Sequence, residues 1–413
     1  MILVTLILSM AVILFLVSKK VNIGYSLIIG SVLLALLNGR GLLYTFKILA
    51  SSLLEPTTVT LSLTIALITI LGHLMEVYLI MDRMITALEK ILRSAKFTIL
   101  MAPAIIGTLL VTGGALMSCP VVESLGNRLH LEKDKKAAIN LIFRHALYFI
   151  FPLSTTILLA AEIGDFNVWD FVKLQFPIAV VMYIAGYVLY LRHSHEPRLE
   201  KIQPREYLDA IGAFLLYSSP ILVSLLGVVL LKLPFHVSLF FGILCSILIH
   251  LYDEKKDPQY HVEQGIIKTI IKGIKPPMII AVIGVMIFKN VMNDFQEIYT
   301  QLGALLNEGI PLEIIMFAAC AFISFSLAST QPSIAIMFPM ILPLAPNYDV
   351  KLLYAMFIYT SGFVFYYISP MHLCQVLTLE YFEVNLKDLY KNYIIILPII
   401  YVTMLIIYGL HMM

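Results

Sequence analysis

Charge is scarce in this sequence. Asp, Glu, Lys and Arg together make up 13% of its residues, whereas soluble domains carry about 25%. So little charge cannot cover a water-facing surface, and composition therefore excludes an ordinary soluble protein. Hydrophobic residues instead reach 60% and occur in runs of about 17–25, the length of helix that crosses a bilayer. The alternating ten-residue segments of a membrane β-barrel are missing, so we predict an all-α polytopic membrane protein.

Cysteine is also rare. Four are present and no two form a CxxC pair, so the sequence suggests neither a disulfide framework nor a zinc site. Nothing resembles a nucleic-acid-binding module, so we expect no metal, no nucleic-acid partner and no cofactor other than a coupling ion. Clustered catalytic pairs are missing as well. Ser369 and His372 stand at i, i+3 without an acid to orient them, so we predict that the protein is not an enzyme.

Ten apolar segments have the length and composition of membrane-spanning helices. They fall into two groups of five: 2–17, 21–37, 58–80, 137–161 and 171–191, then 210–231, 235–251, 278–291, 352–379 and 393–411. Between the third and fourth members of each group lies an apolar stretch interrupted by small, polar and proline residues. We predict that these stretches, 97–127 and 311–346, are re-entrant hairpins.

Similar features occur in the same order on either side of a polar linker at 193–206. Amphipathic segments precede Pro56 and Pro276, interrupted stretches centre on Pro120 and Pro332, and the next helices break at Pro152 and Pro370. We therefore predict that 1–192 and 207–413 are two copies of one unit. Because five spans is an odd number, the second copy must be inverted, as in many secondary transporters.

The distribution of basic residues sets the expected orientation. Lys and Arg are retained in cytoplasmic loops, and most of the 28 in this chain share one face if both chain ends lie outside. The first apolar run lacks the preceding positive charges of a secretory signal, so we expect it to be retained. The prediction is a multi-pass protein of the cell (inner) membrane with its N- and C-termini outside.

Helix breaks at membrane depth are tolerated only where they are buried in protein or line a wet cavity, so the four predicted breaks mark the candidate site. Their polar side chains are Ser118 and Cys119; Ser154, Thr155 and Thr156; Ser329, Thr330 and Gln331; and Ser369, His372 and Gln375. They could bind a solute or a coupling ion such as Na⁺ at the hairpin tips. Ser and Thr can equally stabilise a proline kink without binding anything.

Arg144 is the most informative single residue because it lies about two turns into a predicted membrane helix. Arg144, Tyr148, Phe151 and Thr155 follow i, i+4, i+7, i+11 spacing and should share a face. A buried guanidinium beside hydroxyl groups could hold a carboxylate or phosphate through paired hydrogen bonds; alternatively it could extend to the membrane interface. The neighbouring His145 could titrate or simply pack.

Glu123 is the best candidate for a buried coupling acid. It follows Pro120 within the first interrupted stretch. Alternatively, it caps the returning helix or pairs with Arg128.

The segments GGALMSCPVVESLGNRL, FRHALYFIFPLSTTILLAAE and SLASTQPSIAIMFP, together with the overall arrangement, resemble the ion transporter superfamily. That group contains anion permeases and sodium/proton antiporters, and the chain is most similar to a prokaryotic ten-helix integral-membrane family within it. The resemblance implies that hairpin tips and helix breaks form the substrate and cation site, and that a homodimer moves elevator-like transport domains. Dicarboxylate and citrate members often carry Ser-Asn-Thr at the tips, and this chain has no asparagine there.

These observations predict a secondary active transporter of a small organic, carboxylate-like anion, coupled to Na⁺ or H⁺. The alternatives are a Na⁺/H⁺ antiporter and a translocase of an anionic lipid head group. The expected partners are a small-molecule anion, membrane lipid and a second copy of the chain.

Overall fold

The computed structural model describes residues 2–19, 21–108, 114–194, 203–256, 265–295, 297 and 311–412, and every regular element within these ranges is a helix. The first half contains α1 (Ile2–Ser18), α2 (Ile23–Leu37), α3 (Leu42–Leu54), α4 (Pro56–Val77), α5 (Ile80–Leu92), α6 (Ala95–Gly107), α7 (Gly114–Arg128), α8 (Lys133–Ala146), η1 (Leu147–Phe149), α9 (Thr155–Gly164), α10 (Val168–Gly186) and η2 (Tyr187–Leu191). The second contains α11 (Pro204–Val229), α12 (Phe235–Lys256), α13 (Ile266–Gly273), α14 (Pro276–Asp294), α16 (Leu312–Leu327), α17 (Gln331–Ile341), η3 (Leu342–Leu344), α18 (Tyr348–Tyr367), α19 (Leu373–Phe382) and α20 (Leu386–Met412).

Seven helical stretches of the described chain are long and apolar enough to cross a membrane. α4, α11, α12, α18 and α20 each qualify, as do α10 with η2 and α13 with α14. The predicted all-α, polytopic character is therefore confirmed. Three of the ten predicted spans are not among these seven. α1 and α2 are shorter apolar helices, with 17 and 15 residues, and a break divides the segment 137–161. The predicted linker 193–206 lies mostly outside the described residues, and α11 begins within it.

The predicted breaks at Pro152 and Pro370 are confirmed. The chain leaves helical structure after η1 and resumes it at Thr155, and it does the same between Tyr367 and Leu373. The second interrupted stretch, 311–346, also breaks, just before Pro332, where Ala328 ends α16 in a left-handed conformation with φ of 47°. Prolines flanked by polar residues in an apolar run thus mark these three breaks correctly.

The predicted break at Pro120 is wrong, because α7 runs from Gly114 through it, while the start of the predicted interruption, at 112–113, lies outside the described residues. A proline removes one backbone donor and crowds the preceding turn of a helix. Polar side chains gather one residue before the carbonyl that Pro120 leaves without a donor: the Ala115 carbonyl accepts hydrogen bonds from Ser118 Oγ at 3.1 Å, Cys119 Sγ at 3.1 Å and Asn140 Nδ2 at 3.3 Å. Ser118 and Cys119 therefore lie on a helix instead of at a hairpin tip. Residues 109–113, which precede α7, lie outside the described residues.

Side chains from neighbouring helices satisfy the carbonyl groups that the two helix breaks release. At the first break, Tyr359 Oη donates to the Tyr148 carbonyl at 2.8 Å and Gln175 Nε2 to the Phe149 carbonyl at 3.3 Å. At the second, the donors are Tyr390 Oη to the Ile368 carbonyl and Gln375 Nε2 to the Ser369 carbonyl, the latter at 3.2 Å. An unsatisfied backbone group costs several kcal/mol in hydrocarbon, so these bonds make the breaks possible.

Replacing Tyr359 by phenylalanine should therefore destabilise the fold. The change leaves the Tyr148 carbonyl without this donor in a buried site, at a cost of about 1–2 kcal/mol. Thermal unfolding of the purified protein in detergent measures the effect. Tyr25→Phe, at a tyrosine that is 51% exposed, is the matched control and should leave the melting temperature unchanged. Equal melting temperatures for the two variants would contradict this account of the break.

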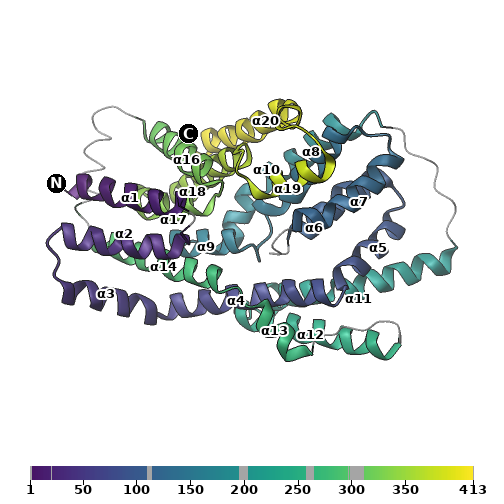
Figure 1. Cartoon of the computed structure of the whole chain (residues 1–413), viewed down its shortest axis with the longest axis horizontal. Helices are drawn as coiled ribbons and strands as arrows, with labels where there is room; N and C mark the ends of the chain where they lie inside the picture. Colours follow the sequence, from purple (N-terminus) through teal and green to yellow (C-terminus); the bar gives the residue numbers. More distant parts are fainter. Residues whose placement is uncertain are drawn as a thin grey trace.

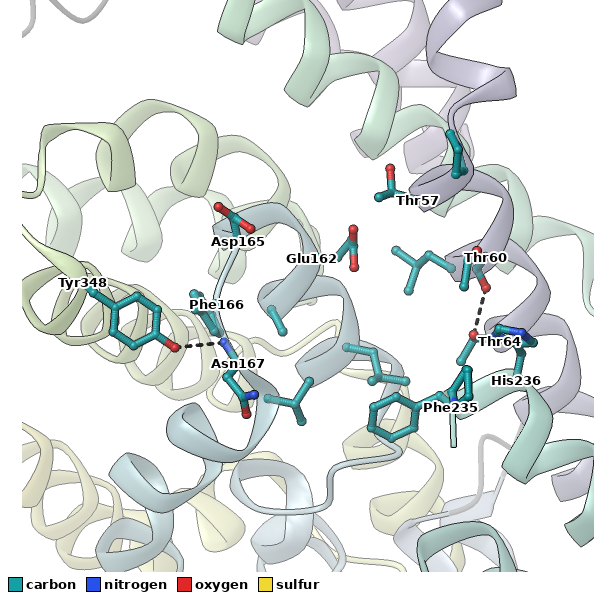
Figure 2. A pocket seen from close by; sticks show the side chains of 16 residues that line it. Thr57, Thr60, Thr64, Glu162, Asp165, Phe166, Asn167, Phe235, His236 and Tyr348 are labelled. Carbon is teal, nitrogen blue, oxygen red and sulfur yellow. Dashed lines mark hydrogen bonds between the residues drawn. The ribbon is translucent and has the colours of Figure 1, made fainter. Parts of the chain in front are cut away.

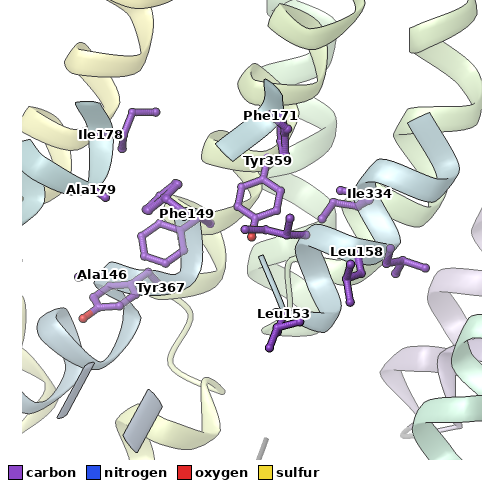
Figure 3. Close-up of a cluster of buried hydrophobic side chains, with 14 of the residues drawn as sticks. Ala146, Phe149, Leu153, Leu158, Phe171, Ile178, Ala179, Ile334, Tyr359 and Tyr367 are labelled. Carbon is purple, nitrogen blue, oxygen red and sulfur yellow. The ribbon is translucent and has the colours of Figure 1, made fainter. Parts of the chain in front are cut away.

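Aromatic side chains pack around the first break (Figure 3). The Phe149 ring lies 6.0 Å from that of Tyr359 and 4.7 Å from that of Phe363, and Phe171 approaches Tyr359 at 5.5 Å, all between ring centroids. All four side chains are buried. Lipid is as apolar as these rings, so close packing, not exclusion of water, holds helices together here. These packed rings hold the residues of the break in place.

Several element boundaries recur at one constant offset in the two halves. α9 and α19 begin at Thr155 and Leu373 and end at Gly164 and Phe382. The left-handed residues after them are Asp165 and Glu383, and the next helices begin at Val168 and Leu386. The difference in residue number is the same for all four pairs. The same offset relates Pro152 to Pro370, the pair from which the sequence predicted a repeat.

The helices form two groups that each combine both halves of the chain. The α4 group comprises α1–α5 with α11–α14, in which α2 packs on α14 and α4 on α12; the α8 group comprises α6–α10 with α16–α20, in which α10 packs on α20 and α18 on α16. In Figure 1, α3, α4, α11 and α12 lie along one long edge and α8, α10 and α20 toward the other. The groups meet where α9 contacts α4 and α14, and where α17 contacts α14.

Candidate functional site

A cavity of about 300 Å³ opens at the first helix break, and we call it the arginine cavity. Its walls come from α6, the α8–α9 break, α14 and the α18–α19 segment. Its lining residues are Gly107, Thr108, Arg144, His145, Leu147, Tyr148, Phe151, Ser154, Thr155, Thr156, Met278, Tyr366 and Cys374. The volume is at the lower end of the range for small-molecule sites, about 300–1,000 Å³.

Arg144 lines this cavity and is 8% exposed. The other three residues predicted to share its face, Tyr148, Phe151 and Thr155, line the same cavity. Close packing by α6 helps to hold Arg144 there: a Cβ atom on Gly107 would lie 2.1 Å from the Arg144 carbonyl oxygen. A glycine is therefore required where α6 crosses α8.

The N-terminus of α9 contributes the polar part of the wall. Ser154 is its N-cap residue and makes no side-chain hydrogen bond to the helix, while Thr155 and Thr156 form the first turn. The first amide groups of a helix have no intrahelical acceptor and carry partial positive charge. Together with Arg144, this helix end makes the cavity favourable for a negatively charged group.

A second cavity, of about 210 Å³, adjoins the first, and we call it the glutamine cavity. Thr155 and Met278 line both cavities, and Gln331 at the start of α17 lines the second. Thr330, just before it, is 2% exposed and its hydroxyl has no hydrogen-bond partner among the described residues. The start of α17 therefore contributes to the same region as the first helix break.

Two histidines meet beside the arginine cavity. Tyr366 Oη lies 3.3 Å from His145 Nε2 and 2.6 Å from His372 Nε2. His145 Nδ1 donates to the Leu141 carbonyl at 2.7 Å. His145 belongs to the first half of the chain and His372 to the second, so both halves contribute to the surroundings of one hydroxyl group.

Other predicted site residues have structural partners away from the cavity. Cys119 Sγ accepts a hydrogen bond from Asn140 Nδ2 at 3.3 Å, and the same Asn140 amide group donates to Thr378 Oγ1 at 3.0 Å. Tyr381 Oη donates to Glu123 Oε2 at 2.7 Å, whereas Arg128 pairs with Glu89 at 2.8 Å. Other predicted residues that line neither cavity are Ser118, Ser329, Thr330, Ser369, His372 and Gln375.

Six residues that line the arginine cavity were missed by the sequence analysis: Gly107, Thr108, Leu147, Met278, Tyr366 and Cys374. Tyr366 could have been found, because it stands at the same offset from Tyr148 as Pro370 does from Pro152. Cys374 stands at this same offset from Thr156, and the other four carry no comparable signal in the sequence.

A third and larger cavity, of about 660 Å³, lies farther along the interface between the helix groups, and we call it the threonine cavity (Figure 2). Thr57, Thr60 and Thr64 of α4 face Glu162, Asp165 and Asn167 across it. Adjacent residues of α9, Leu158 and Leu159, line the threonine and glutamine cavities respectively. The three cavities thus follow one interface, and the two carboxyl groups make the largest of them less suited to an anion.

A family model described as "Protein of unknown function (DUF401)" matches residues 2–411. The chain belongs to this DUF401 family. No curated protein matches it.

Among solved structures, the fold is similar to one entitled "Crystal structure of the Alcanivorax borkumensis YdaH transporter reveals an unusual topology". The TM-score is 0.65 at 13% sequence identity, over 91% of this chain and 90% of that chain. This DUF401 chain therefore shares a fold with a membrane transporter over nearly its whole length.

Proposed function

We propose that the protein is a secondary active transporter of a small organic, carboxylate-like anion, coupled to Na⁺ or H⁺. The observation that carries the proposal is the pairing of Arg144 with the N-terminus of α9 in one cavity at a broken helix. An arginine binds a carboxylate through two parallel hydrogen bonds, and free helix amides at an N-terminus favour the same charge. No Asp or Glu is found among the described residues that line the arginine and glutamine cavities.

The location of these cavities supports transport over simple binding. They lie where the α4 group meets the α8 group, with Met278 of α14 on one side and Thr155 of α9 on the other. Movement of one group along the other would change which end of the interface is open. We propose that this movement provides alternating access, in a homodimer as the resemblance to the ion transporter superfamily implies.

The constant offset between α9 and α19 supports two inverted repeats, 1–192 and 207–413. Both chain ends lie toward the same side of the molecule in Figure 1, as an even number of crossings requires. The expected location is the cell membrane, with both ends outside. The fold shared with the YdaH transporter favours membership of a transporter superfamily.

A ligand screen on the purified full-length protein tests the proposal. Anions that bind only the folded state should raise its melting temperature, since saturation at about 100 times Kd adds about 2.7 kcal/mol of stability. Mono-, di- and tricarboxylates should be compared with their uncharged amides, each with and without Na⁺ and at two pH values. We expect at least one carboxylate to stabilise the protein and its amide not to do so. Equal effects of acids and amides, or no effect of any anion, would reject an anion site.

The alternative of a Na⁺/H⁺ antiporter receives less support. Its best acid, Glu123, is half-buried, bonded to Tyr381 and absent from the lining of all three cavities. Vesicles loaded with a pH-sensitive dye would distinguish the two functions, because an antiporter moves protons in response to Na⁺ without any organic solute.

A further inference from the structure

Three potential metal ligands lie together at the arginine cavity. One ring nitrogen of His145, one of His372 and the sulfur of Cys374 all lie within 4.8 Å of one another. His145 comes from α8, His372 is the N-cap residue of α19 and Cys374 lies in the first turn of that helix. His145 and Cys374 line the cavity, whereas His372 is 1% exposed.

The hydrogen bonds of His145 prepare it to coordinate an ion. Its Nδ1 donates to the Leu141 carbonyl at 2.7 Å, which leaves the lone pair of the neutral ring on Nε2. Metal-binding histidines almost always donate their other N–H in this way, and the bond fixes both tautomer and orientation. Nε2 lies toward the Tyr366 hydroxyl at 3.3 Å.

His372 is almost completely buried, and its ring lies against that of His145, with 5.1 Å between the ring centroids. Its Nδ1 makes no hydrogen bond of normal geometry among the described residues. Its Nε2 contacts the Tyr366 hydroxyl at 2.6 Å, so this hydroxyl now occupies the space between the two imidazole rings.

We propose that His145, His372 and Cys374 form a three-ligand site for a zinc-like divalent transition metal, with its fourth position open to the arginine cavity. Two imidazoles and a thiolate are ligands that zinc and cobalt prefer. With bond lengths of about 2.0–2.3 Å, ligand atoms of a tetrahedral site lie roughly 3.3–3.8 Å apart. The three ligand atoms now lie within 4.8 Å of one another. To reach the tetrahedral geometry, the side chains would have to shift by about 1 Å, and Tyr366 would have to rotate.

Charge and proton balance are consistent with this site. Binding requires the Cys374 thiolate, so the thiol proton is released as the ion enters. A divalent ion with two neutral imidazoles and one thiolate forms a complex with a net charge of +1. Arg144 lies on the same cavity and opposes a cation there, but an anion at the open fourth position would contact both positive groups and reduce their repulsion. The metal site itself does not depend on the proposed transport function.

Cobalt(II) provides a direct test on the purified full-length protein. A cysteine thiolate bound to Co²⁺ should produce a charge-transfer band in the near ultraviolet. Cys374→Ser should abolish this band, and His372→Asn should weaken Co²⁺ binding about tenfold or more. Cys245→Ser is the matched control and should keep the band, because Cys245 lies on α12, where it contacts Ser219 of α11. A band retained in Cys374→Ser, or no band at millimolar Co²⁺, would reject the site.

A measurement on the unaltered protein avoids any effect of substitution on folding. Zn²⁺ should slow alkylation of Cys374 about tenfold or more, and mass spectrometry of the modified peptides can use Cys245 as the internal reference. Equal rates at Cys374 with and without Zn²⁺ would overturn the proposal, whatever the variants show.

Discussion

Replacing Gly24 by leucine should destabilise the protein by about 3 kcal/mol or prevent its folding, as expected for severe overpacking. Gly24 lies where α2 crosses α14, and a Cβ atom there would be 2.0 Å from the Ile280 carbonyl oxygen. The facing Gly284 would place a Cβ atom 2.2 Å from the Gly24 carbonyl oxygen. Backbone meets backbone at this crossing, so no side-chain rotation can relieve the clash.

The same change should also affect the site. α14 carries Met278, which lines both the arginine and the glutamine cavities, and separation of α2 from α14 would displace it. Gly212→Leu is the matched control, because a Cβ atom at Gly212 meets nothing within 4 Å. We expect Gly212→Leu to unfold at or above the temperature of the unaltered protein, and Gly24→Leu well below it. Thermal unfolding in detergent gives both values, and similar values would show that α2 and α14 can separate at little cost.

The sequence predicts much of the fold because each signal is local. Pro152 and Pro370 interrupt long apolar runs beside polar residues, and the chain breaks at both. Pro120 has a similar local context, yet α7 continues through it. α7 packs against α6, α8 and α19, and such contacts between distant segments cannot be read from the residues around a proline.

The candidate site is predicted only in part, for a related reason. Arg144 was found because a buried cation is unusual in a membrane helix, whatever the rest of the chain does. Cys374 and Gly107 lie at the same cavity because α6 and α19 both pack on α8, a contact between distant segments. Glu123 illustrates the opposite error, since its position on α7 brings it to Tyr381 and not to the cavity. Chemistry selects candidate residues, but helix packing decides which of them meet.

Arg144→Gln should lower the affinity for the transported anion by about 30- to 1,000-fold. Loss of one partner of a buried, hydrogen-bonded charge pair costs roughly 2–4 kcal/mol, and each 1.4 kcal/mol is a factor of about ten. The hydroxyl groups of Ser154 and Thr155 and the N-terminus of α9 would remain, so some binding should persist. Titration of the best anion from the ligand screen, followed by thermal unfolding, measures this loss.

Arg144→Lys separates charge from geometry. Lysine keeps the positive charge but cannot form the two parallel hydrogen bonds of a guanidinium, so its affinity should fall between those of the unaltered protein and Arg144→Gln. Arg128→Gln is the control, because Arg128 pairs with Glu89 and lines none of the three cavities. Uptake of the same anion into proteoliposomes should follow the order of the affinities. If Arg144→Gln binds and transports the anion as well as Arg128→Gln does, then Arg144 does not hold the substrate and the anion must bind elsewhere.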